Sequence, residues 1–378
     1  MSRETILLVS LRTCLIALAI TGMFAFDAAA ADAPQQTPPP SPTRGKGPHD
    51  DVTLAAVGDV LFGRYDEDKT YLPVPHVADP FLELAPELRA SDLAFCNVES
   101  PVVPEPKSFG VYKRMTFRAD PEKMTLVANA GFDVVSLANN HMFNMKAVSV
   151  PETVANVAAA GLRPGGAGKT PADAMRPVVL DVHGVRVVFL MFTVWNNTGK
   201  GGFTKDGSLA FFEHEGKLEK TAVAEIRAAR RYLDADFVVV SIHWGLEYHD
   251  HPHSGQEKLA AAMQEAGADL VLGHHPHVVQ DVRWKRGQAI VFSMGNFLFD
   301  NPTLDRRETM VFHATLSQPG PLRHVSSVEL EPLMIDRKTH APGFARGKDY
   351  ARWSKRLSKL APGITIRPER PDDGAAPR

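Results

Sequence analysis

From residue 51 onward, short runs of hydrophobic residues alternate with amphipathic segments of helical length. The run VTLAAVGD at 52–59 is apolar until it ends in Gly-Asp, which is typical of a buried strand leading into a loop. The segment PEKMTLVANAG at 121–131 begins with Pro and ends with Gly, as helices commonly do. The pattern predicts strands at 52–59, 93–96, 132–137, 237–242, 269–272, 289–293, 309–316 and 325–330, and helices at 82–90, 121–131, 150–161, 215–233 and 256–266.

Two further apolar runs, at 178–181 and 185–192, are joined around His183 and Gly184 and predict a β-hairpin. Elsewhere, strands and helices alternate as expected of an α/β domain with its helices on the outside. In such domains, ligands bind beyond the carboxyl ends of the strands. Side chains that follow the predicted strands are therefore the first candidates for a functional site.

The two ends of the chain depart from this pattern. The uncharged apolar stretch at 13–26 is followed by three alanines, which predicts a secretory signal peptide at 1–30 or an uncleaved membrane anchor. Residues 31–50 are rich in proline and predict a disordered linker. We expect one folded domain at 51–345 and a partly disordered C-terminal extension at 346–378. The protein is therefore expected to be exported, to the periplasm or outside the cell, with or without an N-terminal anchor.

Composition narrows the function classes. The 378 residues include 42 Lys and Arg against 44 Asp and Glu, so no basic surface for nucleic acid is expected. The 2 cysteines are too few for a disulfide scaffold or a cysteine-rich zinc module. Histidine is clustered instead, with seven of the 15 between residues 243 and 277. Three of these, His249, His251 and His253, fit a solvent-exposed polar loop better than a metal site.

Residues of the metal-ligand type follow five of the predicted strands. They are Asp59 after the first, Asn97 and Glu99 after the second, Asn140 and His141 after the third, His243 after the fourth, and His275 and His277 after the fifth. Taken alone, each has a simpler role, such as a turn residue or a helix cap. Together they favour one or two divalent metal ions, with Mn, Fe or Zn expected. Such a centre can activate a bound water, while a histidine that is not a ligand protonates the leaving group.

Six segments resemble, in order, signature segments of the bacterial capsule-synthesis protein CapA family, which is associated with poly-γ-glutamate biosynthesis. They are VGDVLFGR (57–64), NVESPV (97–102), SLANNH (136–141), IHWGLEY (242–248), GHHPHVVQ (273–280) and FSMGNFLFD (292–300). The family resembles calcineurin-like metallophosphoesterases, so the resemblance implies a four-layer α/β/β/α sandwich with a metal centre between the layers. It also implies that His141 is the catalytic acid and that the metal ligands are Asp59, Glu99, Asn140, His243, His275 and His277.

Three positions depart from the pattern that the resemblance implies. Leu61 stands where the phosphoesterases have a histidine ligand, and Glu99 stands where they have a shorter bridging Asp. Asn144 stands where the family often has Asp, which weakens a contact expected to support the site. These departures leave open whether a two-metal phosphodiesterase site is complete.

Further polar residues are candidates for substrate binding, namely Asn97, Arg114, Arg118, Glu247 and Asn296. The two arginines could bind a phosphate or carboxylate of the substrate, or simply solvate a loop. Glu247 could orient a metal ligand instead of binding substrate. Asn296 follows a late strand, from which it could buttress the site.

Three functions follow from these observations. The leading prediction is an exported metal-dependent hydrolase of the metallophosphatase type that acts on a polymer or small molecule in capsule, poly-γ-glutamate or other cell-envelope polymer synthesis. Leu61 and the N-terminal segment also fit a non-catalytic assembly component of a membrane capsule-synthase complex. The third prediction is a metal-dependent γ-glutamyl amide hydrolase or ligase, which would act on an amide bond instead of a phosphoester bond.

Overall fold

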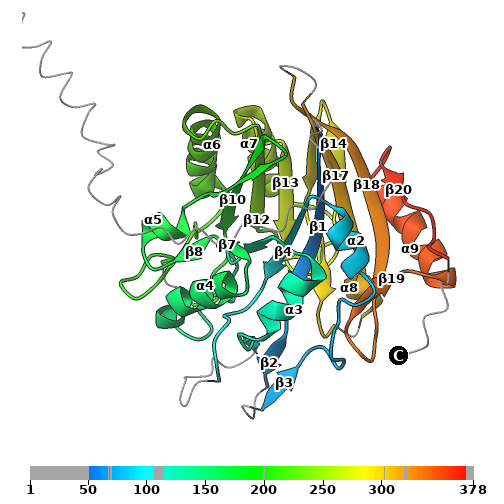
Figure 1. Ribbon diagram of the computed structural model, residues 1–378, viewed down its shortest axis with the longest axis horizontal. Helices are drawn as coiled ribbons and strands as arrows, with labels where there is room; N and C mark the ends of the chain where they lie inside the picture. Colours follow the sequence, from blue (N-terminus) through cyan, green and yellow to red (C-terminus); the bar gives the residue numbers. More distant parts are fainter. Residues whose placement is uncertain are drawn as a thin grey trace, which may run out of the picture. The chain divides into compact units, whose positions relative to one another are not determined.

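The computed structural model describes residues 51–66, 68, 70–105, 115–198, 201–301, 303–318 and 322–371 (Figure 1). The predicted signal peptide or anchor at 1–30 and the linker at 31–50 lie outside the described residues, as does the chain from residue 372 onward. Within the described ranges, no helix is both long enough and apolar enough to cross a membrane.

The first of two large sheets has 9 strands, of which seven follow the order β19-β18-β17-β1-β4-β6-β7 while β16 pairs with β1 and β20 with β18. Strands β1, β4, β6 and β7 run parallel. Strand β17 is antiparallel to β1 and β18, and β18 is antiparallel to β19 but parallel to β20. The strands are β1 (Asp51–Val60), β4 (Leu93–Val98), β6 (Val134–Ser136), β7 (Arg163–Gly165), β16 (Asn296–Leu298), β17 (Glu308–Ser317), β18 (His324–Ile335), β19 (Pro342–Phe344) and β20 (Thr365–Ile366).

The second sheet has 6 strands in the order β14-β15-β13-β12-β10-β9, with the four central strands parallel and an antiparallel strand at each edge. The strands are β9 (Val178–Val182), β10 (Val185–Thr193), β12 (Phe237–His243), β13 (Leu270–His274), β14 (Val282–Lys285) and β15 (Gln288–Val291). The predicted hairpin is confirmed as β9 and β10. Its turn residues His183 and Gly184 have φ of 53° and 82°, the left-handed conformation that two-residue hairpin turns require.

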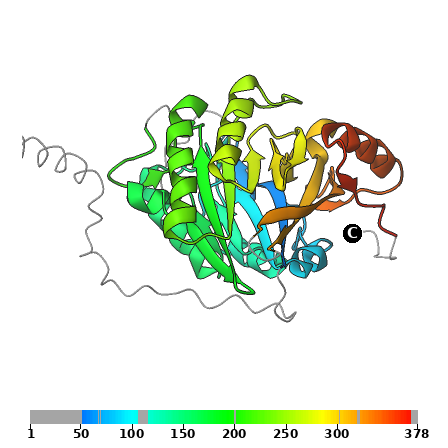
Figure 2. The same cartoon turned by 90° about the horizontal axis from the view of Figure 1, so that it is seen from above.

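The two sheets pack face to face, and helices cover both outer faces (Figures 1 and 2). Between the sheets, the ring of Phe95 on β4 stacks on Phe189 of β10, with 5.9 Å between centroids. Helices α6 (Glu215–Tyr232) and α7 (Ser254–Ala266) pack on the second sheet, and α2 (Ala85–Ala90), α3 (Lys123–Ala130) and α4 (Val150–Ala159) pack on the first. The predicted four-layer α/β/β/α sandwich is therefore confirmed.

The helices follow from local sequence features. Helix α6 buries Leu218, Ala222, Ile226 and Ala229, whose spacing of three or four residues places them on one face. Helices α3 and α7 end at glycines in the left-handed conformation, with φ of 108° and 112°, as their sequences predict.

Short elements complete the domain. A three-stranded sheet contains β2 (Gly63–Tyr65), β3 (Tyr71–Pro73) and β5 (Thr116–Phe117), and a two-stranded sheet contains β8 (Ala167–Gly168) and β11 (Ser208–Leu209). Three single-turn helices are η2 (Ala147–Ser149), α5 (Pro171–Ala174) and α8 (Leu304–Arg307). The unpaired cysteine Cys96 lies on β4 and is buried in the outer core of the first sheet.

Helix α9 (Gly347–Leu360) was not among the elements expected from the sequence. Its residues Trp353, Leu357 and Leu360 are buried in the same core that lies between the two sheets. The Trp353 indole also donates a hydrogen bond of 2.7 Å to the carbonyl of Thr309 on β17. The domain boundary after residue 345 stays a prediction, but α9 contributes side chains to the core of the domain.

Candidate metal centre

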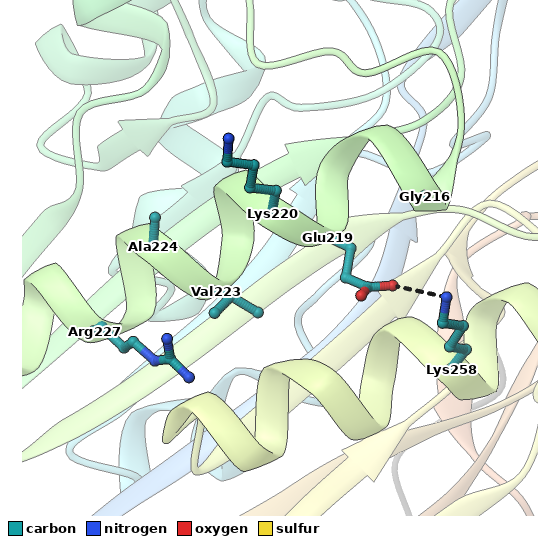
Figure 3. A pocket seen from close by; sticks show the side chains of 7 residues that line it. All are labelled: Gly216, Glu219, Lys220, Val223, Ala224, Arg227 and Lys258. Atoms are coloured by element: carbon teal, nitrogen blue, oxygen red, sulfur yellow. Dashed lines mark ion pairs between the residues drawn. The ribbon is translucent and has the colours of Figure 1, made fainter. Parts of the chain in front are cut away.

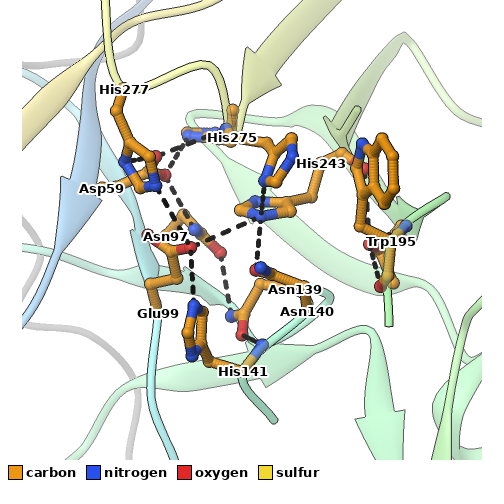
Figure 4. Close-up of polar contacts among 12 residues, drawn as sticks. Asp59, Asn97, Glu99, Asn139, Asn140, His141, Trp195, His243, His275 and His277 are labelled. Atoms are coloured by element: carbon orange, nitrogen blue, oxygen red, sulfur yellow. Dashed lines mark hydrogen bonds and ion pairs between the residues drawn. The ribbon is translucent and has the colours of Figure 1, made fainter. Parts of the chain in front are cut away.

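Strands from both sheets bring the six predicted metal ligands together in one buried cluster (Figure 4). The first sheet supplies Asp59 near the end of β1, Glu99 just after β4 and Asn140 after β6. The second supplies His243 at the end of β12, and His275 and His277 in the loop after β13. Because these strands are parallel within each sheet, their carboxyl ends meet at one edge of the sandwich. We call this cluster the metal centre.

Glu99 occupies the middle of the metal centre. Its side chain is fully buried, and neither carboxylate oxygen has a hydrogen-bond partner within the part of the chain that the structure describes. The atom Oε1 lies 3.5 Å from Nε2 of His243, 3.9 Å from Nε2 of His141 and 3.9 Å from Nε2 of His277. Burial, together with the charges of Asp59 and Glu247, raises the pKa of Glu99 well above its ordinary value. A buried carboxylate without a partner is costly unless a cation binds it.

Two groups of donor atoms share Glu99. One contains Glu99, His243 and His275, and the other contains Asp59, Glu99 and His277, with the donor atoms of each group within 4.8 Å of one another. In the first group, Nε2 of His243 lies 3.1 Å from Nδ1 of His275, and it also lies 2.9 Å from Oδ1 of Asn140, next to the group. Metal–ligand distances of about 2.0–2.2 Å place the ligands of one ion roughly 3–3.5 Å apart, so this spacing fits a bound ion.

The protonation of the histidines also fits metal binding. Burial lowers the pKa of His275 to about 3 and that of His243 well below its ordinary value. Both imidazoles are therefore neutral at physiological pH, which is the form that binds a metal.

Asp59 is held in place by neighbours from two strand ends, those of β4 and β13. Oδ1 accepts a hydrogen bond of 2.8 Å from the Asn97 amide and lies 3.1 Å from Nδ1 of His274, while Oδ2 accepts one of 3.3 Å from the backbone N–H of His275. Burial opposes ionisation of Asp59, but His274, His277 and Asn97 together lower its pKa. Asn97 is fully buried and in turn contacts Asn139 at 3.3 Å. The structure thus places Asn97 as a support for Asp59.

His141, the predicted catalytic acid, lies beside the metal centre. Its Nδ1 is 2.8 Å from Oδ1 of Asn144, which also accepts the backbone N–H of Phe117 at 2.7 Å. That second bond fixes the amide orientation, so His141 donates through Nδ1 and keeps Nε2 free of a proton when neutral. The ring stacks on Phe117 at 3.7 Å, and burial lowers the pKa of His141 to about 3. Nε2 faces Glu99 and the amide of Asn197, which lies 3.4 Å away.

Asn296 buttresses His277, as its position after a late strand suggests. Its Oδ1 lies 2.9 Å from Nδ1 of His277, and its amide donates to the carbonyls of His277 and Arg306 at 3.3 and 3.0 Å. His275 and His277 have φ of 97° and 59°, conformations that non-glycine residues rarely adopt. The contact with Asn296 holds the His277 ring, and the contact of 3.1 Å with Nε2 of His243 holds the His275 ring, although both backbone conformations are strained.

The remaining candidates for substrate binding are not part of the buried metal centre. Arg114 lies outside the described residues. The buried guanidinium of Arg118 donates to the Tyr65 hydroxyl at 2.9 Å, to the Val103 carbonyl at 3.0 Å and to Asp120 at 2.5 Å, none of which belongs to the metal centre. Glu247 is exposed, and its charge acts on Glu99.

Leu61 and the polar loop at 249–253 contribute no metal donor. Leu61 is fully buried in the outer hydrophobic core of the first sheet. His251 pairs with Asp281 at 2.8 Å on the surface, and His253 caps α7 by accepting the backbone N–H of Gly255 at 3.1 Å. The structure therefore agrees with a solvated loop at these histidines.

Several side chains of the site had no assigned role in the sequence. His274 contacts Asp59, Asn139 supports Asn97, and Asn197 hydrogen-bonds both Asn140 and His141. The Trp195 ring lies 5.1 Å from the ring of His275 (Figure 4). Asn139 and His274 directly adjoin predicted ligands, and adjacency was the only available signal for them. Trp195 and Asn197 follow β10, the strand of the hairpin that pairs with β12.

A groove of about 550 Å³ between α6 and α7 is separate from the metal centre (Figure 3). It is lined by Gly216, Glu219, Lys220, Val223, Ala224, Arg227 and Lys258. Glu219 and Lys258 form an ion pair of 3.5 Å across it. No predicted site residue lines this groove, so it carries no functional assignment.

Comparison with known proteins gives both family and distant structural matches. The family model described as bacterial capsule synthesis protein PGA_cap matches residues 53–301. The PGA biosynthesis protein CapA of Bacillus subtilis (strain 168) is 32% identical over 295 residues, which are 78% of this chain and 74% of that protein. The capsule biosynthesis protein CapA of Bacillus anthracis is 32% identical over 321 residues, or 82% of this chain and 74% of that protein. Among solved structures, the calcineurin-like phosphoesterase YfkN from Bacillus subtilis has a TM-score of 0.46 and 13% identity, over 82% of this chain and 98% of that one.

Proposed function

The chain belongs to the bacterial capsule synthesis protein family, and from this premise we propose that it is an exported metal-dependent hydrolase of the metallophosphatase type. Its task would lie in the synthesis of capsule, poly-γ-glutamate or another cell-envelope polymer, as the names of its relatives indicate for those proteins. Export is proposed from the apolar segment at 13–26 and the alanines that follow it.

The observation that carries the proposal is the carboxylate of Glu99. It is buried without a hydrogen-bond partner among the described residues, and the Nε2 atoms of His243, His141 and His277 lie within 3.9 Å of it. Leaving such a group uncompensated costs free energy that a bound cation would recover. A merely structural cluster would be expected to pair this carboxylate with a donor.

The residues present fit one or two divalent ions. Asp59, Glu99, Asn140, His243, His275 and His277 would hold them, and this mixture of carboxylate, amide and imidazole donors suits Mn, Fe or Zn. Such an ion, when bound, supplies positive charge that activates water and stabilises charge on a phosphoryl group. Asn97 and His274 would orient Asp59, and Asn296 would orient His277.

His141 would move the proton. Because its Nδ1–H is donated to Asn144, Nε2 is the nitrogen left to exchange a proton with the leaving group. Asn144 is neutral and provides no counter-charge for the protonated ring. Because burial lowers the pKa of His141 to about 3, the resting ring is neutral at pH 7, so Nε2 would first take up a proton and then pass it to the leaving group.

Metal analysis combined with phosphodiester turnover tests the proposal. We expect the purified protein to contain a divalent transition metal, to hydrolyse bis-p-nitrophenyl phosphate, and to lose about 100-fold or more of that activity on His141→Ala. His251→Ala is the matched control, because the side chain of His251 is 71% exposed and pairs only with Asp281 among the described residues. Metal-free protein, or unchanged activity in His141→Ala, would contradict the proposal. A γ-glutamyl amide in the same assay separates the amide hydrolase or ligase from phosphoester chemistry.

A non-catalytic role in a membrane synthase complex is the second candidate. It is favoured by Leu61, an apolar buried residue where phosphoesterases have a histidine ligand. Polymer production in cells that carry Asp59→Ala with His277→Ala decides between the two roles. Production that survives this double change but fails on removal of residues 1–30 would favour the assembly role.

A further inference from the structure

Two exposed aromatic side chains flank the metal centre, and the guanidinium of an arginine stacks on one of them. Trp195 is 38% exposed beside His275, and Tyr248 is 40% exposed with its ring 6.0 Å from that of His277. The guanidinium carbon of Arg306 lies 3.4 Å from the centre of the Tyr248 ring. We call these two residues the Tyr248–Arg306 pair.

Arg306 is connected to a metal ligand through one side chain. Its backbone carbonyl accepts a hydrogen bond of 3.0 Å from the amide of Asn296, and Asn296 also contacts Nδ1 of His277 at 2.9 Å. The guanidinium of Arg306 donates from Nη1 to Asn301 at 3.2 Å. A shift of Arg306 therefore involves the same amide that orients His277.

The charge of Arg306 is not neutralised by a carboxylate among the described residues. Of the acidic groups nearby, Asp300 pairs with Arg64 at 2.5 Å, and Glu247 is exposed, with its charge acting on the Tyr248 hydroxyl. Nε of Arg306 is buried and has no hydrogen-bond partner in the described part of the chain. Because that N–H is closed to solvent, an external anion would meet the guanidinium through its Nη atoms, of which Nη1 already donates to Asn301.

We propose that the Tyr248–Arg306 pair is a subsite that binds an oxyanion of the substrate, a carboxylate or a phosphate, next to the metal centre. A guanidinium binds such groups with two parallel hydrogen bonds, and stacking on an aromatic ring fixes its plane. The substrate would thus carry a second negative group beside the bond that is cleaved, as a polyanionic polymer does. This inference rests on the proposed function, but it concerns binding and does not require turnover.

Titration calorimetry of the full chain loaded with Mn²⁺ tests the subsite with two probes. A γ-linked tetraglutamate presents carboxylates, and its analogue with amides in their place is the neutral counterpart. Glycerol 3-phosphate presents a phosphate, with glycerol as its neutral counterpart. We expect Arg306→Gln to weaken binding of one anionic probe by about 10- to 100-fold and to leave its neutral counterpart unchanged. The probe that is affected identifies the oxyanion.

The matched control is Arg231→Gln, because Arg231 stacks on Tyr232 at 5.4 Å on α6, where no predicted metal ligand lies. Metal content is measured in each variant, so loss of the metal is distinguished from loss of the subsite. If Arg306→Gln does not fold, Arg306→Lys is used, which keeps the charge but not the paired hydrogen bonds and is expected to bind about 10-fold more weakly. The proposal is overturned if both anionic probes bind the variant as tightly as the unaltered protein, or if neither binds the unaltered protein.

Discussion

Glu99 is proposed to bind the metal, but the same buried carboxylate lowers the stability of the metal-free protein at neutral pH. Without a metal, its buried carboxylate has no hydrogen-bond partner within the described ranges, and burial raises its pKa above the ordinary value of 4.5. The folded metal-free protein therefore keeps a proton that the unfolded chain releases. The contribution of Glu99 to the free energy of unfolding is fully present below a pH of about 4.5, and it is lost as the pH rises through the folded-state pKa of Glu99.

We predict that Glu99→Gln stabilises the metal-free protein at neutral pH. The amide needs no proton taken up on folding, so the free energy of unfolding should rise by about 1–3 kcal/mol at pH 7, and the difference should shrink toward pH 4.5. Urea unfolding of both proteins with chelator present measures this at each pH. A variant that is less stable than the unaltered protein at pH 7 would show that Glu99 has a partner in solution.

Arg118 is one of two arginines that the sequence offers either as an anion contact or as a loop residue, and the structure places its guanidinium away from the metal centre. Arg118 is buried, with its guanidinium engaged by Tyr65, Val103 and Asp120, although its sequence context resembles that of an exposed loop. Arg306 lies far along the chain from Tyr248, and nothing in the sequence joins them. Contacts between distant segments are set by tertiary packing, which a local pattern does not encode.

At the scale of elements, the hydrophobic pattern located most strands and helices, and with them the strand ends that supply the metal centre. It did not decide which strands pair. The ends of β1, β4 and β6 lie in one sheet and those of β12 and β13 in the other, and the pattern is equally apolar in both. Buried parallel strands look alike in sequence, so only the family resemblance implied two sheets.

Helix α9 could have been found from its sequence. Its apolar residues Tyr350, Trp353, Leu357 and Leu360 recur at intervals of three or four, as on one face of a helix. The Pro, Arg and Asp content that predicts a loose end belongs to the chain from Ala361 onward, and it does not describe the α9 segment before it. The periodicity is therefore more informative here than the composition.

We predict that α9 is required for the stability of the domain. Trp353→Ala should lower the free energy of unfolding by about 3–5 kcal/mol, because it empties a buried site and removes the hydrogen bond to Thr309. Denaturant unfolding measures the loss, and Tyr232→Ala, at a side chain that is 72% exposed, is the control. A chain that ends at residue 345 and is as stable as the longer one would instead support the predicted boundary.

At the scale of the whole domain, the metal centre joins the two sheets. Asp59 lies in the first sheet, and Glu99 and Asn140 follow its strands β4 and β6, while His243 lies in the second sheet and His275 and His277 follow its strand β13. An ion that binds ligands from both would hold the sheets together at their carboxyl edge. Because the unfolded chain lacks this arrangement, metal binding should contribute directly to folding stability.

We predict that removal of the metal lowers the unfolding temperature of the whole domain. Free metal at 1,000 times its dissociation constant should add about 4 kcal/mol to the free energy of unfolding. Calorimetry with added Mn²⁺ and with chelator measures the difference. The same experiment on Glu99→Gln should give a much smaller shift, since that variant lacks the shared ligand. Equal shifts in both proteins would place the ion elsewhere.

The buried thiol of Cys96 can report local opening of the domain around β4. The thiol is fully buried on β4, and burial raises its pKa, so it stays protonated and unreactive while the strand is in place. A thiol reagent reaches it only when β4 separates from the outer helices. Glu99 directly follows β4. The labelling rate of Cys96 therefore measures how often β4, the strand that positions Glu99, unfolds locally.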